Sequence, residues 1–201
     1  VMMTDLITGR ETLEDINMIV FCGGFSNSDV LGSAKGWAGA FLFNPKAKEA
    51  LDLFYARKDT LSLGICNGCQ LMVELGLITN DELRMTESSE FGIRNSELKP
   101  RMLHNDSHKF ESAFISLSIP QNNSVMFGSL SGSKLGLWVA HGEGKFHLPE
   151  PESSYNVIAK YNYHGYPANP NGSDYDVAGI CSADGRHLCM MPHLERAIFP
   201  W

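Results

Sequence analysis

Residues 64–70, with the sequence Gly-Ile-Cys-Asn-Gly-Cys-Gln, constrain the fold more than any other part of the chain. They follow a short apolar run at 61–63 and precede an apolar stretch at 71–75 that ends at Gly76. This order predicts a buried strand that turns sharply into a helix, with Cys66 at the turn. Such a nucleophile elbow holds the thiol above the carboxyl end of a sheet. The amino end of the following helix is expected to favour the thiolate.

Strand and helix signals alternate in the first part of the chain. Residues 16–21 are an apolar run that leads into Gly23-Gly24, and a loop is expected to continue to Gly36. Asn44-Pro45 is a helix start, with a capping side chain followed by a proline in the first turn. Strand, helix, strand and helix in succession over 16–76 predict an α/β fold with three layers and a mostly parallel central sheet.

The second half has strand signals without helices between them. The expected strands are 110–119, 134–140, 155–161, 177–182 and 186–191. Asp184-Gly185 between the last two is typical of a β-hairpin, so we expect an additional antiparallel portion in this half. The polar stretch 88–109 is expected to be loop. No repeat or boundary divides the chain, which predicts one domain over 1–201.

A second group of residues follows the last predicted strand. Pro192-His193-Leu194-Glu195 can aim His193 at the thiol, and Glu195 can then hold the other imidazole nitrogen. A lone cysteine at a helix start, a lone histidine and a lone surface glutamate are each commonly structural. Together they predict a triad of Cys66, His193 and Glu195, with a thiol–imidazole hydrogen bond of about 3–4 Å.

The other cysteines allow further interpretations. Five cysteines, an odd number, do not resemble a secreted disulfide framework and favour a reducing cytoplasm. Cys22, Cys181 and Cys189 lie in strand-like apolar runs and are expected to be buried. Cys66 and Cys69 are formally a Cys-x-x-Cys pair, which a redox centre or half of a zinc site would use. No second ligand pair or thioredoxin-like pattern accompanies them, so we predict no metal site and a packed Cys69.

Charge and hydropathy exclude two classes of partner. The formal net charge is −7 over 201 residues, and the 16 basic residues are scattered along the chain. An acidic protein without a basic cluster is poorly suited to nucleic acid or an anionic membrane surface. No apolar run approaches the roughly 20 residues that a membrane-spanning helix needs. We therefore predict neither nucleic acid nor membrane as a partner.

The elbow and the Pro-His-x-Glu step together resemble the class I (triad) glutamine amidotransferases. Further segments resemble one branch, the carboxyl-terminal glutaminase domain of the large single-chain phosphoribosylformylglycinamidine synthase family. These segments are 22–29, 36–38, 105–111 and 140–144. The resemblance covers nearly the whole chain and implies a flavodoxin-like fold. It also leads us to expect that the first strand–helix unit and the carboxyl-terminal tail of the family's domain are missing.

The resemblance implies roles for individual residues. Cys66 would attack the side-chain amide of L-glutamine and form a thioester, while backbone N–H groups stabilise the oxyanion. Arg94 and Asn105 would either line the site or cap turns. The remaining implied site residues are Gly24, Phe25, Asn67 and Gln70 for the oxyanion and substrate, and His141 and Glu143 for pocket lining.

The ammonia would pass to a synthetase region elsewhere in the same enzyme. There it would serve the ATP-dependent conversion of formylglycinamide ribonucleotide to formylglycinamidine ribonucleotide in purine biosynthesis. The chain has no Gly-x-x-x-x-Gly-Lys motif, so we expect no cofactor in this domain and ATP and Mg in the synthetase region. Two alternatives stay open: another cysteine hydrolase of the same fold, and an inert, non-catalytic docking domain.

Overall fold

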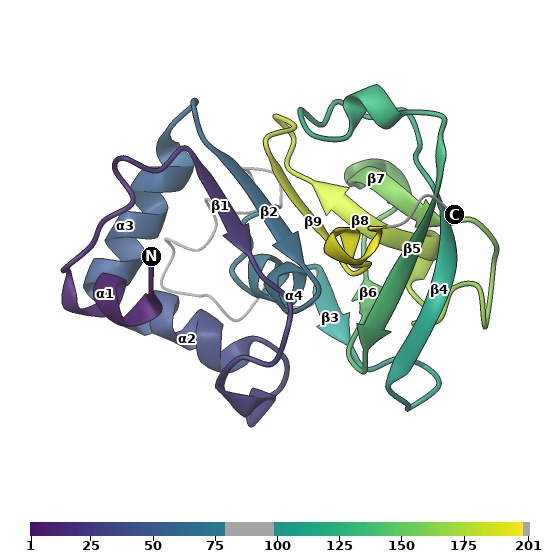
Figure 1. Ribbon diagram of the computed structural model, residues 1–201, viewed down its shortest axis with the longest axis horizontal. Coiled ribbons are helices and arrows are strands. Elements are labelled where there is room, and N and C mark those ends of the chain that lie inside the picture. The colour runs from purple at the N-terminus through teal and green to yellow at the C-terminus, as the bar shows by residue number, and fades with distance from the viewer. Residues whose placement is uncertain (79–98, 199–201) are drawn as a thin grey trace.

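The computed structural model describes residues 1–78 and 99–198 and has an α/β architecture (Figure 1). One sheet has seven strands in the order β1-β2-β9-β8-β7-β4-β5, and β3 pairs with β6 in a separate sheet. The strands are β1 (Met18–Phe21), β2 (Leu61–Ile65), β3 (Arg101–Leu103), β4 (Glu111–Ser118), β5 (Lys134–His141), β6 (Lys145–His147), β7 (Asn156–Tyr161), β8 (Val177–Cys181) and β9 (His187–Met190). The α-helices are α1 (Met3–Thr8), α2 (Lys35–Phe43), α3 (Pro45–Ala56) and α4 (Asn67–Glu74).

Parallel pairing is confined to one end of the large sheet. β1 pairs parallel with β2, and β2 pairs parallel with β9, so the carboxyl ends of these strands share one edge. From β9 to β5 the neighbouring strands are antiparallel. The α/β class is therefore confirmed. The parallel part comprises the strands that alternate with helices together with β9, and the antiparallel part occupies the second half of the chain.

The helices of the first part pack beside β1. In Figure 1, α1, α2 and α3 lie together on that side, and α4 lies close to β1 and β2. α3 begins as predicted, because Asn44 Oδ1 accepts a hydrogen bond from the Ala47 N–H at 3.0 Å and Pro45 occupies the first turn. Its buried stripe consists of Ala47, Leu51, Phe54 and Tyr55.

Two elements were not predicted, α2, which begins at the end of the loop expected to reach Gly36, and β3, which lies in a stretch expected to be loop. α2 has no side-chain cap, contains Gly36 and Gly39, and follows Ala34 in a left-handed conformation with φ of 60°, so it lacks ordinary start signals. Burial of Ala38 and Phe41 on the core side stabilises this helix. β3 is a three-residue strand paired with β6, inside the stretch 88–109 whose first part lies outside the described residues.

The burial of the cysteines follows their position in the strands. Cys181 in β8 and Cys189 in β9 are buried, as predicted. Cys22 is exposed, so that prediction was wrong: it follows the last residue of β1 and lies beyond the paired part of the strand.

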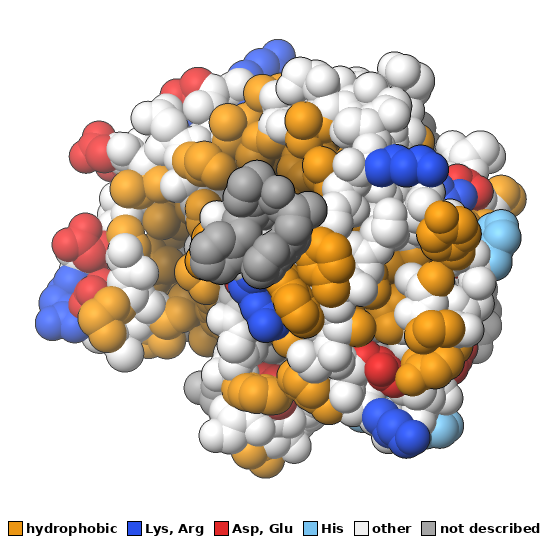
Figure 2. Space-filling view, turned by 45° about the vertical axis from the view of Figure 1, so that its right-hand side comes forward, with side chains coloured by type: hydrophobic (Ala, Val, Ile, Leu, Met, Phe, Trp, Pro, Cys, Tyr) orange, Lys and Arg blue, Asp and Glu red, His pale blue; other side chains and the backbone are white. Residues whose placement is uncertain are grey.

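No helix within 1–78 or 99–198 has the length and apolar character needed to cross a bilayer. On the face in Figure 2, Lys and Arg side chains lie apart from one another.

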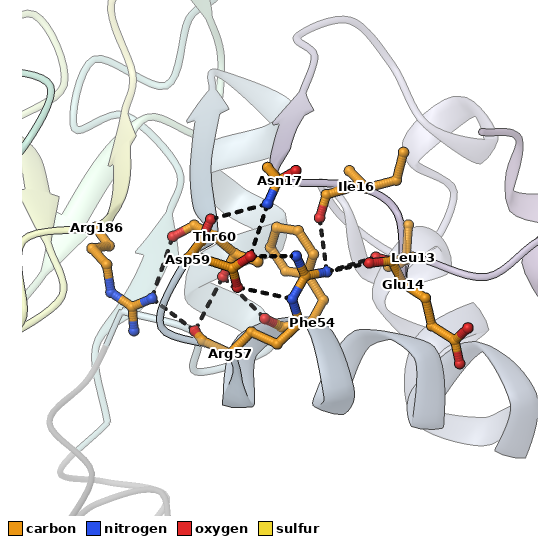
Figure 3. Close-up of polar contacts among 9 residues, drawn as sticks. All are labelled: Leu13, Glu14, Ile16, Asn17, Phe54, Arg57, Asp59, Thr60 and Arg186. Atoms are coloured by element: carbon orange, nitrogen blue, oxygen red, sulfur yellow. Dashed lines mark hydrogen bonds and ion pairs between the residues drawn. The ribbon is translucent and has the colours of Figure 1, made fainter.

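A polar network ties the amino ends of the parallel strands to α3 (Figure 3). Arg57, which follows α3, donates from Nη1 to the backbone oxygens of Glu14 at 2.6 Å and Ile16 at 3.0 Å. Its Nε and Nη2 donate to the two carboxylate oxygens of Asp59 at 3.0 and 2.8 Å. Arg186, just before β9, donates to the backbone oxygen of Arg57 at 2.7 Å. These contacts join segments far apart in the sequence.

Candidate active site

Cys66 occupies the predicted elbow between β2 and α4. Its backbone has φ 53° and ψ −108°, a conformation that L-residues rarely adopt. The Cys66 N–H donates to the Met190 oxygen, and the Cys66 oxygen accepts from the Gln70 N–H, both at 3.0 Å. Gly68 is required nearby, because a Cβ there would lie 2.0 Å from the backbone oxygen of Phe21. The elbow therefore holds a strained backbone by packing it closely against β1 and β9.

The thiol of Cys66 is buried and protonated at neutral pH. Burial raises its pKa to about 11, while hydrogen bonding from the backbone N–H groups of Asn67 and Gly24 lowers the pKa by less. The negative charges of Glu195 and Asp29 raise it further. We expected the helix start to favour the thiolate, and the Asn67 N–H at that start does lower the thiol pKa. The expectation was wrong for the net pKa, which is raised. Desolvation is the larger contribution, so attack by this sulfur requires a base.

His193 is arranged to act as that base. Its Nδ1 lies 2.5 Å from Glu195 Oε1, as predicted, and its backbone N–H donates to the Trp138 oxygen at 2.8 Å. A carboxylate oxygen can only accept, so in the neutral imidazole Nδ1 carries the hydrogen and Nε2 carries a lone pair. Within the described part of the chain, Nε2 is buried and has no hydrogen-bond partner.

Cys66 and His193 meet at Gly23. A Cβ on Gly23 would lie 3.1 Å from His193 Cε1 and 3.3 Å from the Cβ of Cys66, so both side chains border this residue. The predicted thiol–imidazole hydrogen bond is not formed, because Cys66 Sγ instead lies 3.7 Å from the Ala140 oxygen. Catalytic hydrogen bonds are often long or misaligned before substrate binds. The structure brings the side chains of Cys66 and His193 together without a hydrogen bond between them.

Backbone donors flank the sulfur on two sides. The Asn67 N–H belongs to the first turn of α4, and the Gly24 N–H comes from the loop after β1. Gly24 has φ of 109°, a left-handed conformation that suits glycine. Phe25 has a side chain that is 77% exposed and points into solvent. Of the two candidates in this loop, Gly24 is the one whose N–H interacts with the thiol.

Gln70 lies beneath the loop that contains Glu143. Its Nε2 donates to the backbone oxygen of Glu143 at 2.7 Å, and its Oε1 accepts from Asn67 Nδ2 at 3.0 Å. The side chain is only 4% exposed. Both polar ends of the Gln70 amide therefore have protein partners, and its contact with substrate stays a prediction.

His141 belongs to a buried network that the sequence did not reveal. Its Nε2 lies 2.7 Å from Asn171 Oδ1, and burial lowers its pKa to about 4, so the ring is neutral. Asn171 also donates to the Tyr161 hydroxyl at 2.6 Å. Asn105, fully buried, donates to the His141 oxygen at 2.8 Å and accepts from the Gly144 N–H at 2.9 Å.

These asparagines fix the loop 141–144 in place. Asn105 supports this loop through its contacts with His141 and Gly144, while Arg94 lies outside the described residues. Asn171 lies in a stretch whose sequence indicates only a loop, so nothing in the sequence revealed its contacts with residues far along the chain.

Cys69 is completely buried, with a pKa raised well above its usual value by burial. Within 1–78 and 99–198, no cluster of His, Cys, Asp or Glu is arranged to hold a metal ion.

Comparisons with known proteins agree with this geometry. The chain matches the family model of the CobB/CobQ-like glutamine amidotransferase domain over residues 1–201. It is 42% identical over 215 residues to phosphoribosylformylglycinamidine synthase of Homo sapiens. It is also 42% identical over 213 residues to a probable phosphoribosylformylglycinamidine synthase, chloroplastic/mitochondrial, of Arabidopsis thaliana. All of this chain is aligned, but it spans only 16% and 15% of these relatives.

Solved structures show the same fold. A chain in the structure of PurLQS from Thermotoga maritima is 28% identical with a TM-score of 0.71, and the match covers 94% of this chain and 74% of that one. A glutamine amidotransferase from the same organism, 17% identical with a TM-score of 0.54, supports the fold alone. The resemblance inferred from the sequence motifs is confirmed. The chain belongs to the CobB/CobQ-like glutamine amidotransferase family.

Proposed function

We propose that this chain hydrolyses L-glutamine through a thioester on Cys66. The observation that carries the proposal is the arrangement of His193 beside the elbow cysteine. Its Nδ1 faces a carboxylate, and its buried Nε2 has no hydrogen-bond partner among the described residues. A base with this orientation is the partner that a protonated thiol needs. The catalytic residues are Cys66, His193 and Glu195.

The first half of the reaction forms the thioester and releases ammonia. Nε2 of His193 takes the thiol proton as the sulfur attacks the side-chain amide carbon of glutamine. The N–H groups of Asn67 and Gly24 stabilise the resulting oxyanion, and one such donor contributes about 2.7–4 kcal/mol. The imidazolium then gives its proton to the leaving nitrogen, and ammonia departs. Glu195 stabilises the charged imidazole throughout.

The second half regenerates the enzyme. His193 removes a proton from water, whose oxygen attacks the thioester carbon, and the same two N–H groups hold the second oxyanion. The carbon–sulfur bond breaks, the sulfur regains a proton from His193, and glutamate is released. His141 and Glu143 line this region. His141 stays neutral there because burial lowers its pKa to about 4.

We propose further that the ammonia serves a synthetase region of the same enzyme. The support is the 42% identity to phosphoribosylformylglycinamidine synthases, of which this chain spans about a sixth. The synthetase region would bind ATP and Mg and convert formylglycinamide ribonucleotide to formylglycinamidine ribonucleotide. We place the enzyme in a reducing cytoplasm because its five cysteines are free, although the Arabidopsis relative carries a chloroplastic/mitochondrial name.

The test compares glutamine with ammonia as nitrogen donor in the full-length enzyme. Cys66→Ala should abolish glutamine-dependent synthesis and leave ammonia-dependent synthesis intact, because the two sites are separate. Retained glutamine-dependent synthesis in Cys66→Ala would refute the nucleophile assignment. An unaltered chain that hydrolyses no glutamine in the assembled enzyme would favour the inert docking domain instead.

A further inference from the structure

The loop from Gly24 to Ala34 carries an oxyanion donor, and among its apolar side chains only that of Ala34 is packed in the core. Phe25, Val30 and Leu31 are 77%, 81% and 74% exposed, so these apolar side chains do not anchor the loop in the core. Ser28, Asp29 and Ala34 have φ of 55°, 47° and 60°. Non-glycine residues hold such left-handed conformations only where their surroundings enforce them. The loop therefore needs polar anchors.

Asp29 provides the first anchor. Its Oδ1 accepts from the Ala34 N–H at 3.3 Å, which closes the end of the loop onto its middle. The same oxygen accepts from Ser26 Oγ at 3.4 Å and from Asn67 Nδ2 at 3.5 Å. One carboxylate oxygen thus links the loop to itself and to the first residue of α4.

Glu143 provides the second anchor. Its Oε2 accepts from the Ser33 N–H at 3.2 Å, although the two residues are 110 positions apart in the sequence. The backbone oxygen of Glu143 accepts from Gln70 Nε2 at 2.7 Å, and Gln70 Oε1 accepts from Asn67 Nδ2 at 3.0 Å. Asn67 Nδ2 also donates to Asp29, so the hydrogen bonds connect Glu143 back to the loop. Together they form a closed ring that includes the loop, the first turn of α4 and the segment after β5.

We propose that Asp29 and Glu143 are positioning residues that hold the loop so that the Gly24 N–H faces Cys66. This inference rests on the glutaminase function proposed above. The two carboxylates contact neither the sulfur nor the imidazole by any hydrogen bond among the described residues, so they act through the loop. Loss of either carboxylate should free Gly24, and the oxyanion should then lose a donor that Asn67 alone cannot replace.

The first test uses glutamine hydrolysis by the full-length enzyme. Glu143→Ala removes the acceptor for the Ser33 N–H, whereas Glu143→Gln keeps an acceptor oxygen. We expect Glu143→Ala to lower kcat by roughly tenfold to a hundredfold, somewhat less than complete removal of a donor, with a smaller change in KM. Glu143→Gln should recover most of this loss. Glu49→Ala, an exposed glutamate on α3, is the matched control and should behave like the unaltered protein.

The second test measures the pH profile of Cys66 alkylation by iodoacetamide, with the labelled site read by mass spectrometry. Hydrogen bonding from Gly24 lowers the thiol pKa more than the charge of Asp29 raises it, and Glu195 is the other charge acting on the sulfur. If Asp29 positions the loop, Asp29→Ala should shift the profile to higher pH. If Asp29 acts only through its charge, the shift is to lower pH.

The outcomes separate this inference from the proposed function. A Glu143→Ala enzyme that matches Glu49→Ala in kcat would overturn the positioning role and leave the glutaminase intact. Equal losses in Glu143→Ala and Glu143→Gln would also overturn it, because the acceptor oxygen would then be irrelevant. An unaltered enzyme that hydrolyses no glutamine would refute the proposed function whatever the alkylation profiles show.

Discussion

The two ends of the parallel strands are held in different ways. At the amino ends, the Arg57 guanidinium donates to Asp59 and to backbone oxygens of the segment before β1 (Figure 3). Arg186 in turn donates to the backbone oxygen of Arg57. At the carboxyl ends, Cys66 has a strained backbone, and His193 Nε2 is buried without a partner among the described residues.

This difference indicates that the amino ends of the parallel strands contribute to stability, whereas the carboxyl ends carry the chemistry. Buried polar groups are normally satisfied, and an exception in a well-packed region points to a functional constraint. The amino end follows the rule through ordinary ion pairs and backbone contacts. The carboxyl end departs from it at His193 Nε2, which is buried without a hydrogen-bond partner among the described residues. Substitutions at the two ends should therefore affect different quantities.

After loss of Cys66 itself, the largest effect on activity is expected for His193→Ala. Without a base the thiol, with a pKa of about 11, keeps its proton at neutral pH, and kcat for glutamine hydrolysis should fall by about 10,000-fold. Glu195→Ala should cost less, because its side chain is 58% exposed and acts through His193. Steady-state kinetics with the unfolding midpoint as control will test this. Near-normal kcat in His193→Ala would mean that another group is the base.

The largest effect on stability is expected for Gly68→Ala. Its Cβ would lie 2.0 Å from the Phe21 oxygen, so the first turn of α4 must move away from β1, at a cost of about 3 kcal/mol or more. Gly39→Ala in α2 is the matched control. Its Cβ would meet only the Phe43 ring at 3.7 Å, and the helix should gain up to about 1 kcal/mol. Urea unfolding measures both, and an unaffected Gly68→Ala protein would contradict the packing described.

Arg57→Ala should lower the unfolding midpoint and leave the chemistry alone. It removes contacts to Asp59 and to the backbone before β1, at the end of the sheet far from Cys66. The kcat of the folded variant should equal that of the unaltered protein. Lys48→Ala, which breaks an exposed ion pair with Asp52, is expected to change neither quantity. A fall in kcat with Arg57→Ala would show that the two ends are coupled.

The sequence predicted the parts of the molecule that local signals define. The elbow at Cys66, the cap at Asn44 and the turn at Asp184-Gly185 each combine a short motif with apolar periodicity, and each lies where predicted. α2 was missed because its glycines and its left-handed first cap give no start signal, while tertiary burial stabilises it. Short-range pattern therefore recovered the strands of the large sheet and the elbow at Cys66.

Non-local contacts were beyond prediction. The asparagine network around His141 joins segments separated by 30 or more residues, and nothing in the loop sequences distinguishes Asn105 or Asn171 from ordinary turn residues. The net pKa of Cys66 was also misjudged, because the helix start is visible in the sequence whereas the depth of burial is not. Cys22 was placed in the core because the apolar run continues past the paired part of β1.

A small effect on activity is expected for Cys69→Ser. Cys69 is fully buried and hydrogen-bonded to Cys189, so kcat should stay within a few-fold of normal. Cys22→Ser, at the exposed cysteine after β1, is the control for loss of a thiol. Glutaminase kinetics of both variants measure this. A loss in Cys69→Ser as large as that in Cys66→Ala would mean that the wrong sulfur was assigned.

Direct detection of the thioester tests the central claim. The full-length enzyme is mixed with glutamine, quenched in acid during turnover and digested, and the peptides are analysed by mass spectrometry. We predict a glutamyl thioester on Cys66 in the unaltered enzyme. The Cys66→Ser variant should form no thioester, and the Glu195→Ala variant should still form it. An adduct on Cys22 or Cys69, or undiminished glutamine hydrolysis by Cys66→Ala, would contradict the account.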